Sequence, residues 1–479
     1  MNLNQTLQEK YPHLEISVLK LSEAQKDNES KRIDSEYFKK EYLENEAIIK
    51  IKDNYAFLEN FIVKMTGGAT PLGADYPDKG IPFLRVQNIM QNYFNVEDIV
   101  YISQQDDEYL KRSRLKFNDV LLTITGISYG KSAVVERDLV GANINQHSVK
   151  IEVKNINPYF LSTFLNSKFG KLQSDKKITG VTRPALDYQS IKKFLIPIFP
   201  MEFQLEIQNL VKDSHKALEE SKELYKKAEE TLYLELGLDP KNPLQSLLNS
   251  KTNNSTNSPN ISIRTLKESF LKTGRLDSEY YQSKYEDIEN FIKSYSNGYD
   301  SFLNIINNKD TNFTPKNNEN YNYIELANIG NNGNINEPIS DLGKNLPTRA
   351  RRIVSNGDVI ISSIEGSLSS CALITQEFDK HLVSTGFFVL NSKLLNSETL
   401  LVMFKSQIFQ EYLKKFPSGT ILCAINKEEL SKIFIPKIDP TTQEKIAKYI
   451  QESFNLRKKS KQLLDNAKIK VEEQIQGKV

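Results

Sequence analysis

The stretch Arg32-Ile-Asp-Ser-Glu-Tyr-Phe38 returns later in the chain as Arg275-Leu-Asp-Ser-Glu-Tyr-Tyr281. Five of the seven positions are identical and the other two are conservative, at an offset of 243 residues. An internal repeat decides how the rest of a chain is divided. Here it predicts a fold built from two copies of one unit.

Further matches follow at an offset of 239 residues. They pair Asp119 with Asp358, Gly180 with Gly419, Pro197 with Pro436, and Gln204 with Gln443. The change of offset needs only a few inserted or deleted residues. Two units of this length account for nearly all 479 residues.

Composition marks the joint between the copies. Residues 239–262 include Asn-Asn-Ser-Thr-Asn-Ser-Pro, a polar and turn-prone run that is typical of a flexible linker. We therefore expect a first domain (1–202), a first long helix (203–238), the linker (239–262), a second domain (263–441) and a second long helix (442–479).

Each domain mixes short strands with short helices. Strands are expected at Ile81–Val86, Val120–Ile124 and Ser132–Val135, and in the second copy at Tyr323–Leu326, Val359–Ser362 and Cys371–Ile374. Helical spacing follows Pro158. This mixture predicts the α+β class, with two tandem α/β domains.

A long amphipathic helix ends each copy. Apolar and small residues alternate at spacings of three and four over residues 207–231 and 446–467, which is typical of a coiled-coil seam. Each seam carries two serines: Ser214 and Ser221 in the first, Ser453 and Ser460 in the second. These small residues suit helices that pack closely, so we expect an antiparallel, pseudo-twofold pair. The alternative is that each helix only covers its own domain.

The composition, with 39% hydrophobic and 26% charged residues, suits a soluble globular protein. A formal charge of +2 is not the strongly basic balance of many nucleic-acid binders, although binding depends on local clusters. The two cysteines, Cys371 and Cys423, favour a reducing cytoplasm. The polar N-terminus and the lack of a long apolar run predict neither a signal peptide nor a membrane span.

Motifs that would indicate catalysis are incomplete. Gly126-Ile-Ser-Tyr-Gly-Lys-Ser132 resembles a P-loop, but three residues separate its glycines instead of four. Asn157-Pro-Tyr-Phe160 is similar to a methyltransferase motif but lacks its second proline, and more simply starts a helix. The recurring Asp119 and Asp358 are expected to hold turns. We therefore expect a binding protein with no catalytic residue, metal or cofactor of its own.

Basic residues precede a strand in each copy and suit contacts with phosphates. They are Arg112 and Arg114 in the first copy, and Lys344, Arg349, Arg351 and Arg352 in the second. The alternative is that these residues form an ordinary solvated surface.

Loops that differ between the copies lie within a shared framework. Two readers of different base sequences need this arrangement, because side-chain donors and acceptors specify bases. The candidate contacts are Arg85, Gln87, Asn88, Ser128, Tyr129, Lys131, Thr182 and Arg183 in the first copy, and Ser367, Ser369 and Thr420 in the second.

The order of these segments resembles the specificity subunit of type I restriction-modification systems. The resemblance is carried by Ile81-Pro-Phe-Leu-Arg-Val-Gln-Asn-Ile89, Asn118-Asp-Val-Leu-Leu122 with Gly126–Lys131, Thr182-Arg-Pro184, Ile196-Pro-Ile198, and Glu202 to Gln204 entering a long helix. It covers both copies. The opening at residues 32–38 is also similar to specificity subunits of type IIB systems.

The resemblance implies two target-recognition domains, each reading one half of a bipartite site in double-stranded DNA. It further implies that the helices set the spacing and dock DNA methyltransferase subunits, which carry S-adenosylmethionine and are joined by a restriction or translocase subunit. Two other hypotheses stay open: a coiled-coil scaffold with two non-DNA binding domains, and a stand-alone modification enzyme.

Overall fold

The computed structural model describes residues 3–26, 28, 30–51, 54–71, 73, 76–180, 182–249, 263–419 and 423–477. The chain forms two compact units. Unit 1 comprises Met1–Ala217 with Lys458–Val479, and unit 2 comprises Leu218–Arg457. The units are not consecutive stretches of chain, because the long helices α8 (Met201–Glu235) and α16 (Pro440–Gln476) each contribute to both. The domain boundaries expected from the sequence stay predictions, although both helices begin within two residues of the expected positions.

Unit 1 contains short helices around small sheets. Its helices before α8 are α1 (Leu3–Lys10), α2 (Leu21–Gln25), α3 (Lys40–Lys50), α4 (Gln104–Tyr109), α5 (Pro158–Asn166), α6 (Lys168–Lys177) and α7 (Tyr188–Lys192), with 3-10 turns η1 (Leu58–Asn60), η2 (Val86–Asn88), η3 (Lys111–Ser113) and η4 (Arg137–Leu139). Its strands are β1 (Tyr55–Phe57), β2 (Ile62–Gly67), β3 (Ile81–Leu84), β4 (Val100–Ile102), β5 (Val120–Thr123), β6 (Ser132–Val134), β7 (Asn143–Ile144), β8 (Ser148–Val153) and β9 (Leu195–Pro197).

Unit 2 contains a similar mixture of short helices and strands. Its helices are α9 (Pro243–Asn249), α10 (Phe270–Thr273), α11 (Ser283–Lys293), α12 (Phe302–Ile305), α13 (Ser397–Lys405), α14 (Gln407–Leu413) and α15 (Lys427–Ser431), with η5 (Leu326–Asn328), η6 (Glu365–Ser367) and η7 (Gln376–Phe378). Its strands are β10 (Tyr299–Ser301), β11 (Ile306–Asn308), β12 (Asn320–Ile324), β13 (Ile339–Leu342), β14 (Ala350–Ile353), β15 (Val359–Ser362), β16 (Cys371–Leu373), β17 (Leu382–Ser384), β18 (Phe387–Ser392) and β19 (Phe434–Pro436).

Sheet topology confirms the predicted α+β repeat. The central sheets have the orders β2-β8-β5-β6 and β11-β18-β15-β16, and the second sheets β4-β3-β7 and β13-β12-β17-β14. A two-stranded pair, β1-β9 or β10-β19, completes each unit. The parallel pairs β3/β7 and β12/β17 also correspond.

The central strand of each unit is buried on both faces. In β5, Val120 and Leu122 pack in one cluster with α5, whereas Leu121 packs in another with Leu84 of β3 and Ile144 of β7. Successive side chains of a strand point to opposite faces, so a strand covered on both sides is a continuous apolar run. Strand β15 divides its side chains between two clusters in the same way.

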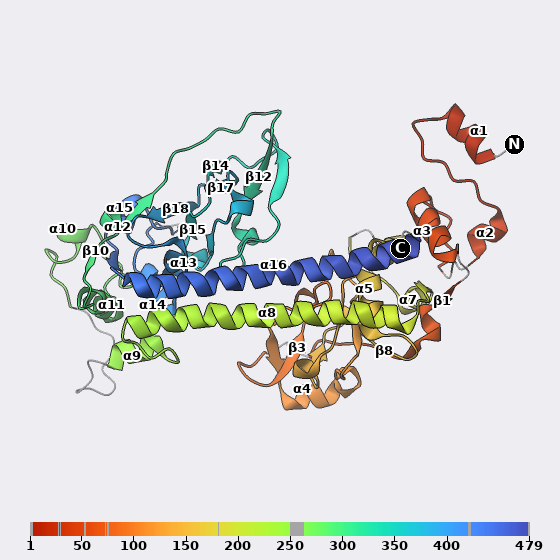
Figure 1. Cartoon of the computed structure of the whole chain (residues 1–479), viewed down its shortest axis with the longest axis horizontal. Helices are drawn as coiled ribbons and strands as arrows, with labels where there is room; N and C mark the ends of the chain where they lie inside the picture. Colours follow the sequence, from red (N-terminus) through yellow and green to blue (C-terminus); the bar gives the residue numbers. More distant parts are fainter. Residues whose placement is uncertain are drawn as a thin grey trace. The chain divides into compact units, whose positions relative to one another are not determined.

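In unit 1, the end of α16 lies along the beginning of α8 (Figure 1). The Ser214 and Ser460 hydroxyls are 2.9 Å apart, and Lys470 forms an ion pair of 2.7 Å with Glu206. The earlier residue of α8, Glu206, is paired with the later residue of α16, Lys470, so the two helices run antiparallel. Ala467 of α16 is part of the buried core.

The other halves of these helices pair in the same sense in unit 2. The Ser221 and Ser453 hydroxyls lie 3.0 Å apart, and Thr442 donates a hydrogen bond of 2.7 Å to Glu235. The predicted antiparallel pairing is therefore confirmed, and the serines are the points of close approach. The alternative, that each helix covers only its own domain, is wrong, since each helix supplies core residues to both units.

The first part of the predicted linker is structured. Residues Pro243–Asn249 form α9, which contacts α11 and α14. Leu247 is buried in the core of unit 2, so the Leu244 and Leu247 spacing of three residues is that of a short packed helix. Residues 250–262 lie outside the described part of the chain.

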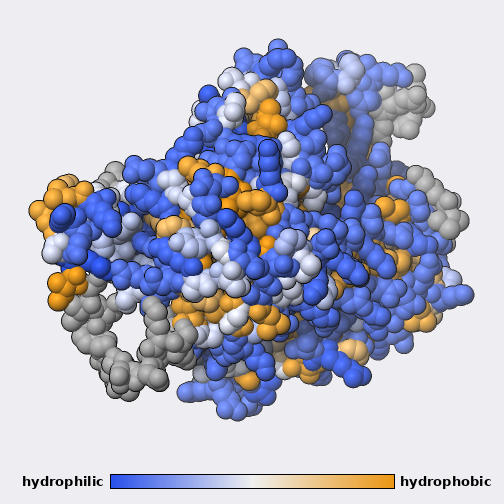
Figure 2. Space-filling view, turned by 60° about the vertical axis from the view of Figure 1, so that its left-hand side comes forward, coloured by the Kyte–Doolittle hydropathy of each residue, from blue (hydrophilic) through white to orange (hydrophobic). Residues whose placement is uncertain are grey.

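Hydrophilic side chains cover most of the face seen in Figure 2, with smaller hydrophobic areas between them. Within the ranges that the structure describes, none of the helices combines the length and apolar character that a bilayer span requires.

Candidate nucleic-acid interface

Two adjacent loops of unit 1 carry five of the predicted contacts. The hairpin loop (residues 126–131) joins β5 to β6, and the bridged loop (residues 180–184) is closed by pairing of Thr179 with Ala185. The Gly126 amide donates to the Pro184 carbonyl at 3.1 Å, which holds the loops together. Gly126 has a φ of +75°, a conformation that favours glycine.

Unit 2 repeats this frame with different residues. Its hairpin loop (365–370) and bridged loop (419–423) are joined by a bond of 3.1 Å from the Glu365 amide to the Cys423 carbonyl. Ser418 pairs with Ala424, 239 residues after the equivalent pair. The hairpin loop here starts with η6 and has no glycine at its first position. Thr420 lies outside the described residues.

The hairpin loop of unit 1 presents side chains of several kinds. Tyr129 donates to Asp175 at 2.8 Å, and the Lys171 ammonium lies 3.7 Å from its ring centre. Burial, with this hydrogen bond, raises the pKa of Tyr129. Lys131 is half-buried, and Ile127, which the sequence analysis did not select, is 98% exposed.

The other predicted loop residues differ in their exposure to solvent and in their hydrogen bonds. Thr182 and Arg183 are exposed on the bridged loop of unit 1. In unit 2, Ser369 is exposed, whereas Ser367 is half-buried and its hydroxyl lies 2.8 Å from that of Ser362. In unit 1 the Ser128 carbonyl accepts a bond of 2.6 Å from the Thr123 hydroxyl, which fixes the loop backbone.

The structure places the candidates at residues 85–88 in a turn outside these loops. Asn88 is fully buried, and its amide donates to Asn95 at 2.9 Å and to Asp98 at 2.8 Å. Arg85 and Gln87 also donate to Asp98. Asn88 therefore shapes the turn, and only Gln87 of the three is exposed.

Some of the predicted basic residues are already paired. Arg114 forms ion pairs with Asp107 and Glu108, each at 2.7 Å. Arg352 donates to the Phe387 carbonyl, and burial lowers the pKa of its guanidinium.

The remaining basic residues are exposed at the surface. Arg112, Lys344 and Arg349 form no ion pair with any residue in the described ranges. Arg351 is also exposed and donates to the Thr348 carbonyl at 2.7 Å. Arg112 lies on η3 and Arg351 on β14, so the aligned arginines occupy different local structures.

The recurring aspartates hold turns, as predicted. Asp119 accepts from the Lys116 amide at 2.8 Å, and Asp358 accepts from the Ser355 amide at 2.7 Å. Each also has a lysine partner, Lys150 at 3.1 Å and Lys309 at 2.8 Å, and these lysines come from different places in the two copies.

The predicted helix start at Pro158 is confirmed. Asn157 caps α5 by accepting from the Tyr159 and Phe160 amides, so this sequence has a structural role. No group of three His, Cys, Asp or Glu side chains suited to a metal occurs among the described residues.

Known proteins match part of this chain. Residues 58–230 match the family model for the type I restriction modification DNA specificity domain. The type I restriction enzyme EcoBI specificity subunit of Escherichia coli is 30% identical over 175 residues, or 35% of this chain and 36% of that protein. The HindI specificity subunit of Haemophilus influenzae is 30% identical over 159 residues, or 32% of this chain and 33% of that protein. The chain thus spans about a third of the length of these relatives.

Solved structures were also found to be similar. The type I S subunit from M. genitalium has 12% identity and a TM-score of 0.41, covering 88% of this chain and 94% of that chain. The HsdS subunit from Thermoanaerobacter tengcongensis has 15% identity and a TM-score of 0.29, covering 89% and 97%. Residues 58–230 of this chain are thus similar to the type I restriction modification DNA specificity domain.

Proposed function

We propose that this chain is the sequence-specific DNA recognition subunit of a type I restriction-modification complex. Each unit reads one half of a bipartite site in double-stranded DNA. The paired loops provide base contacts, and the exposed basic residues outside them contact phosphates.

One observation carries this proposal: both units hold the same pair of loops with the same backbone bonds but fill them with different side chains. The Leu186 amide donates to the Ile124 carbonyl, and 239 residues later the Ile425 amide donates to Ser363, both at 2.8 Å. Bases are distinguished by patterns of donors, acceptors and methyl groups. A constant frame with variable side chains supports reading a different base sequence in each unit.

The near-neutral charge of the chain supports DNA binding in which partner subunits supply further contacts. The formal charge of +2 supplies little general attraction to DNA, so phosphate binding relies on local residues such as Arg112 and Arg349. We propose methyltransferase subunits as partners, docked on α8 and α16, with S-adenosylmethionine bound in those subunits. A restriction or translocase subunit completes the complex. The chain itself is proposed to have no catalytic role and no cofactor.

Exchange of the second expected domain tests this proposal. Residues 263–441 are replaced by the matching segment of a relative, and methylated adenines are mapped in cells that carry the partner subunits. We expect one half of the methylated site to change and the other half to stay. A change in both halves, or in neither, overturns the proposal.

Two measurements address the other hypotheses. Footprinting of the complex that shows no DNA protection would favour a scaffold with non-DNA domains. Methyl transfer by the purified chain without partners would favour a stand-alone enzyme.

A further inference from the structure

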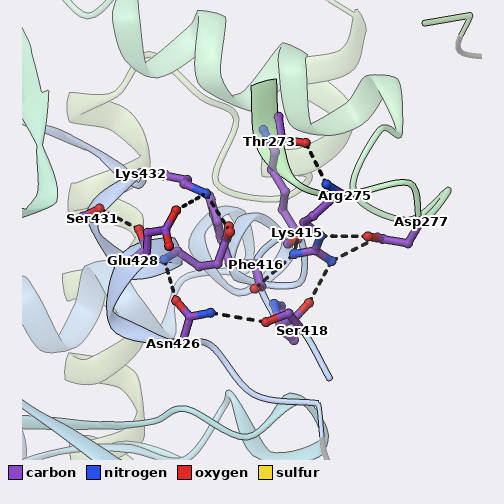
Figure 3. A network of polar contacts seen from close by, with 12 residues as sticks. Thr273, Arg275, Asp277, Lys415, Phe416, Ser418, Asn426, Glu428, Ser431 and Lys432 are labelled. Atoms are coloured by element: carbon purple, nitrogen blue, oxygen red, sulfur yellow. Dashed lines mark hydrogen bonds and ion pairs between the residues drawn. The ribbon is translucent and has the colours of Figure 1, made fainter. Parts of the chain in front are cut away.

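The arginine of the repeated motif is bonded to the backbone that leads into the bridged loop. In unit 2, Arg275 Nη1 donates to the Phe416 carbonyl at 3.3 Å and Nη2 to the Pro417 carbonyl at 2.8 Å. Figure 3 shows the guanidinium pointing at this segment, which continues directly into Ser418. The side chain is 13% exposed, so these bonds lie in a sheltered environment.

The rest of the motif orients this arginine. Asp277 accepts from Arg275 Nε at 2.7 Å and from Nη2 at 3.0 Å, and the guanidinium carbon lies 4.5 Å from the ring centre of Tyr280. The Tyr280 amide in turn donates to Asp277 at 3.1 Å. Arg, Asp and Tyr thus explain three of the five identical positions of the motif.

Unit 1 has the same arrangement. Arg32 Nη1 donates to the carbonyls of Lys176 and Ile178 at 3.3 and 3.0 Å, while Nε and Nη2 donate to Asp34 at 2.8 and 2.6 Å. Tyr37 lies against the guanidinium at 5.1 Å. The hydrogen bond from Arg32 lowers the pKa of Asp34 to about 2.

The segment held in this way ends where the bridged loop begins. Ile178 directly precedes Thr179, and Pro417 directly precedes Ser418, the residues whose pairing closes the two loops. Because the arginine donates hydrogen bonds to backbone carbonyls, these bonds do not depend on the side chains of the loop. The loop sequence can therefore vary while the backbone that enters the loop stays fixed.

We propose that Arg32 and Arg275 are positioning residues for base recognition, each fixing the backbone that enters the bridged loop of its own unit. This inference rests on the proposed function. It assigns a role in discrimination to residues outside the loops, and it predicts that each arginine affects one half-site.

Three variants of the full chain, assembled with its partner methyltransferase subunits, test the proposal: R275A, R275K and R32A. Binding is measured to duplexes of the mapped target and to duplexes with single base-pair changes in either half. We expect R275A to lower the discrimination in one half by about tenfold, within the range of single base contacts. R32A should do the same in the other half only. R275K should resemble R275A, because an ammonium cannot hold the carboxylate and the carbonyls together.

A variant of the same unit separates positioning from general stability. K309M removes the ion pair to Asp358, at the end of β15 opposite the hairpin loop. It should lower the thermal stability of unit 2 and leave base discrimination unchanged. Equal changes in discrimination for R275A and K309M, or a uniform loss of affinity in R275A, overturn the proposal.

The remaining outcomes are also decisive. If R275A fails to fold, D277N keeps the guanidinium and loosens its orientation, so a smaller loss in the same half-site is expected. If D277N then binds the target duplex and the altered duplexes with the same affinity ratio as the wild type, the inference is overturned. A wild-type complex that shows no sequence preference contradicts the proposed function itself.

Discussion

Arg112 and Lys131 occupy different positions in unit 1, and we expect different roles for them. Arg112 lies exposed on η3, outside the paired loops, whereas Lys131 is at the end of the hairpin loop. A phosphate contact adds affinity on every sequence, and a base contact distinguishes between sequences.

Substitution of each residue by alanine should separate the two roles. R112A should weaken binding on all sequences by a similar factor, on the order of three- to tenfold, and reduce the salt slope by about 1. K131A should change the preferred base at one position by about 1–3 kcal/mol. Salt titrations on a panel of duplexes measure both effects. Equal losses on all sequences in K131A would count against its role in readout.

The two cysteines provide a second residue-scale prediction. Complete burial raises the pKa of Cys371 to about 12, whereas Cys423 is in the bridged loop of unit 2, where a hydrogen bond with Glu365, with some burial, raises its pKa. Because the thiolate is the reactive form, alkylation at pH 8 should be slow at Cys423 and absent at Cys371 in the folded protein.

DNA should protect Cys423 if this loop faces the target. Addition of a cognate duplex is expected to slow Cys423 alkylation by about fivefold or more, measured by mass spectrometry, whereas a duplex altered in that half-site should protect less. The E365Q variant is a matched control, since it removes the charge near the thiol without removing the loop. Equal alkylation with and without cognate DNA would place the loop away from the interface.

Exposure of individual site residues was the part that sequence could not supply. Asn88 and Gln87 are neighbours with similar chemistry, but one is buried and the other exposed. Arg352 is engaged by Phe387, a partner 35 residues away that no local pattern reveals. The role of Arg275 was missed for the same reason, although its recurrence was the first signal in the chain.

The long helices were predictable because their periodicity is local, and their contacts depend on very small side chains. Ser221 and Ser453 are buried and hydrogen-bonded, with Ser453 also donating to the Ser221 carbonyl at 2.7 Å. The seam residues indicated a close approach, but the partner of each serine required the structure.

Substitutions at this seam should reveal how close the packing is. S453L adds volume where no space exists and should lower the free energy of unfolding of unit 2 by about 1–3 kcal/mol or more. The double variant S221A/S453A removes both hydroxyls together and should cost less than about 1.5 kcal/mol. Chemical denaturation measures both. N455L, on an exposed position of the same helix, should stay within about 0.5 kcal/mol; a similar loss there would contradict close packing at the seam.

Each compact unit of the molecule contains residues from both copies of the repeat, so the units do not follow the order of the sequence. Ala467, near the end of the second copy, is buried in the core of unit 1 with Ile207 and Val211. Its equivalent in the first copy, Ala228, is buried in the core of unit 2 with Ile446 and Ile450. The repeat and the antiparallel helix pair could be predicted from the sequence, but the core that each helix end joins could not, because offsets do not show which residues pack together.

A charge placed at each alanine should therefore unfold the unit formed mainly by the other copy. A467D buries an unpaired carboxylate in unit 1 and should destabilise that unit by several kcal/mol, with faster amide exchange in β5 and α5 while β15 stays protected. A228D should have the reverse effect. N466D adds the same charge at an exposed neighbour of Ala467 and should change neither unit. If A467D instead increased exchange in β15, the helix end would belong to unit 2, and the two units would follow the order of the sequence.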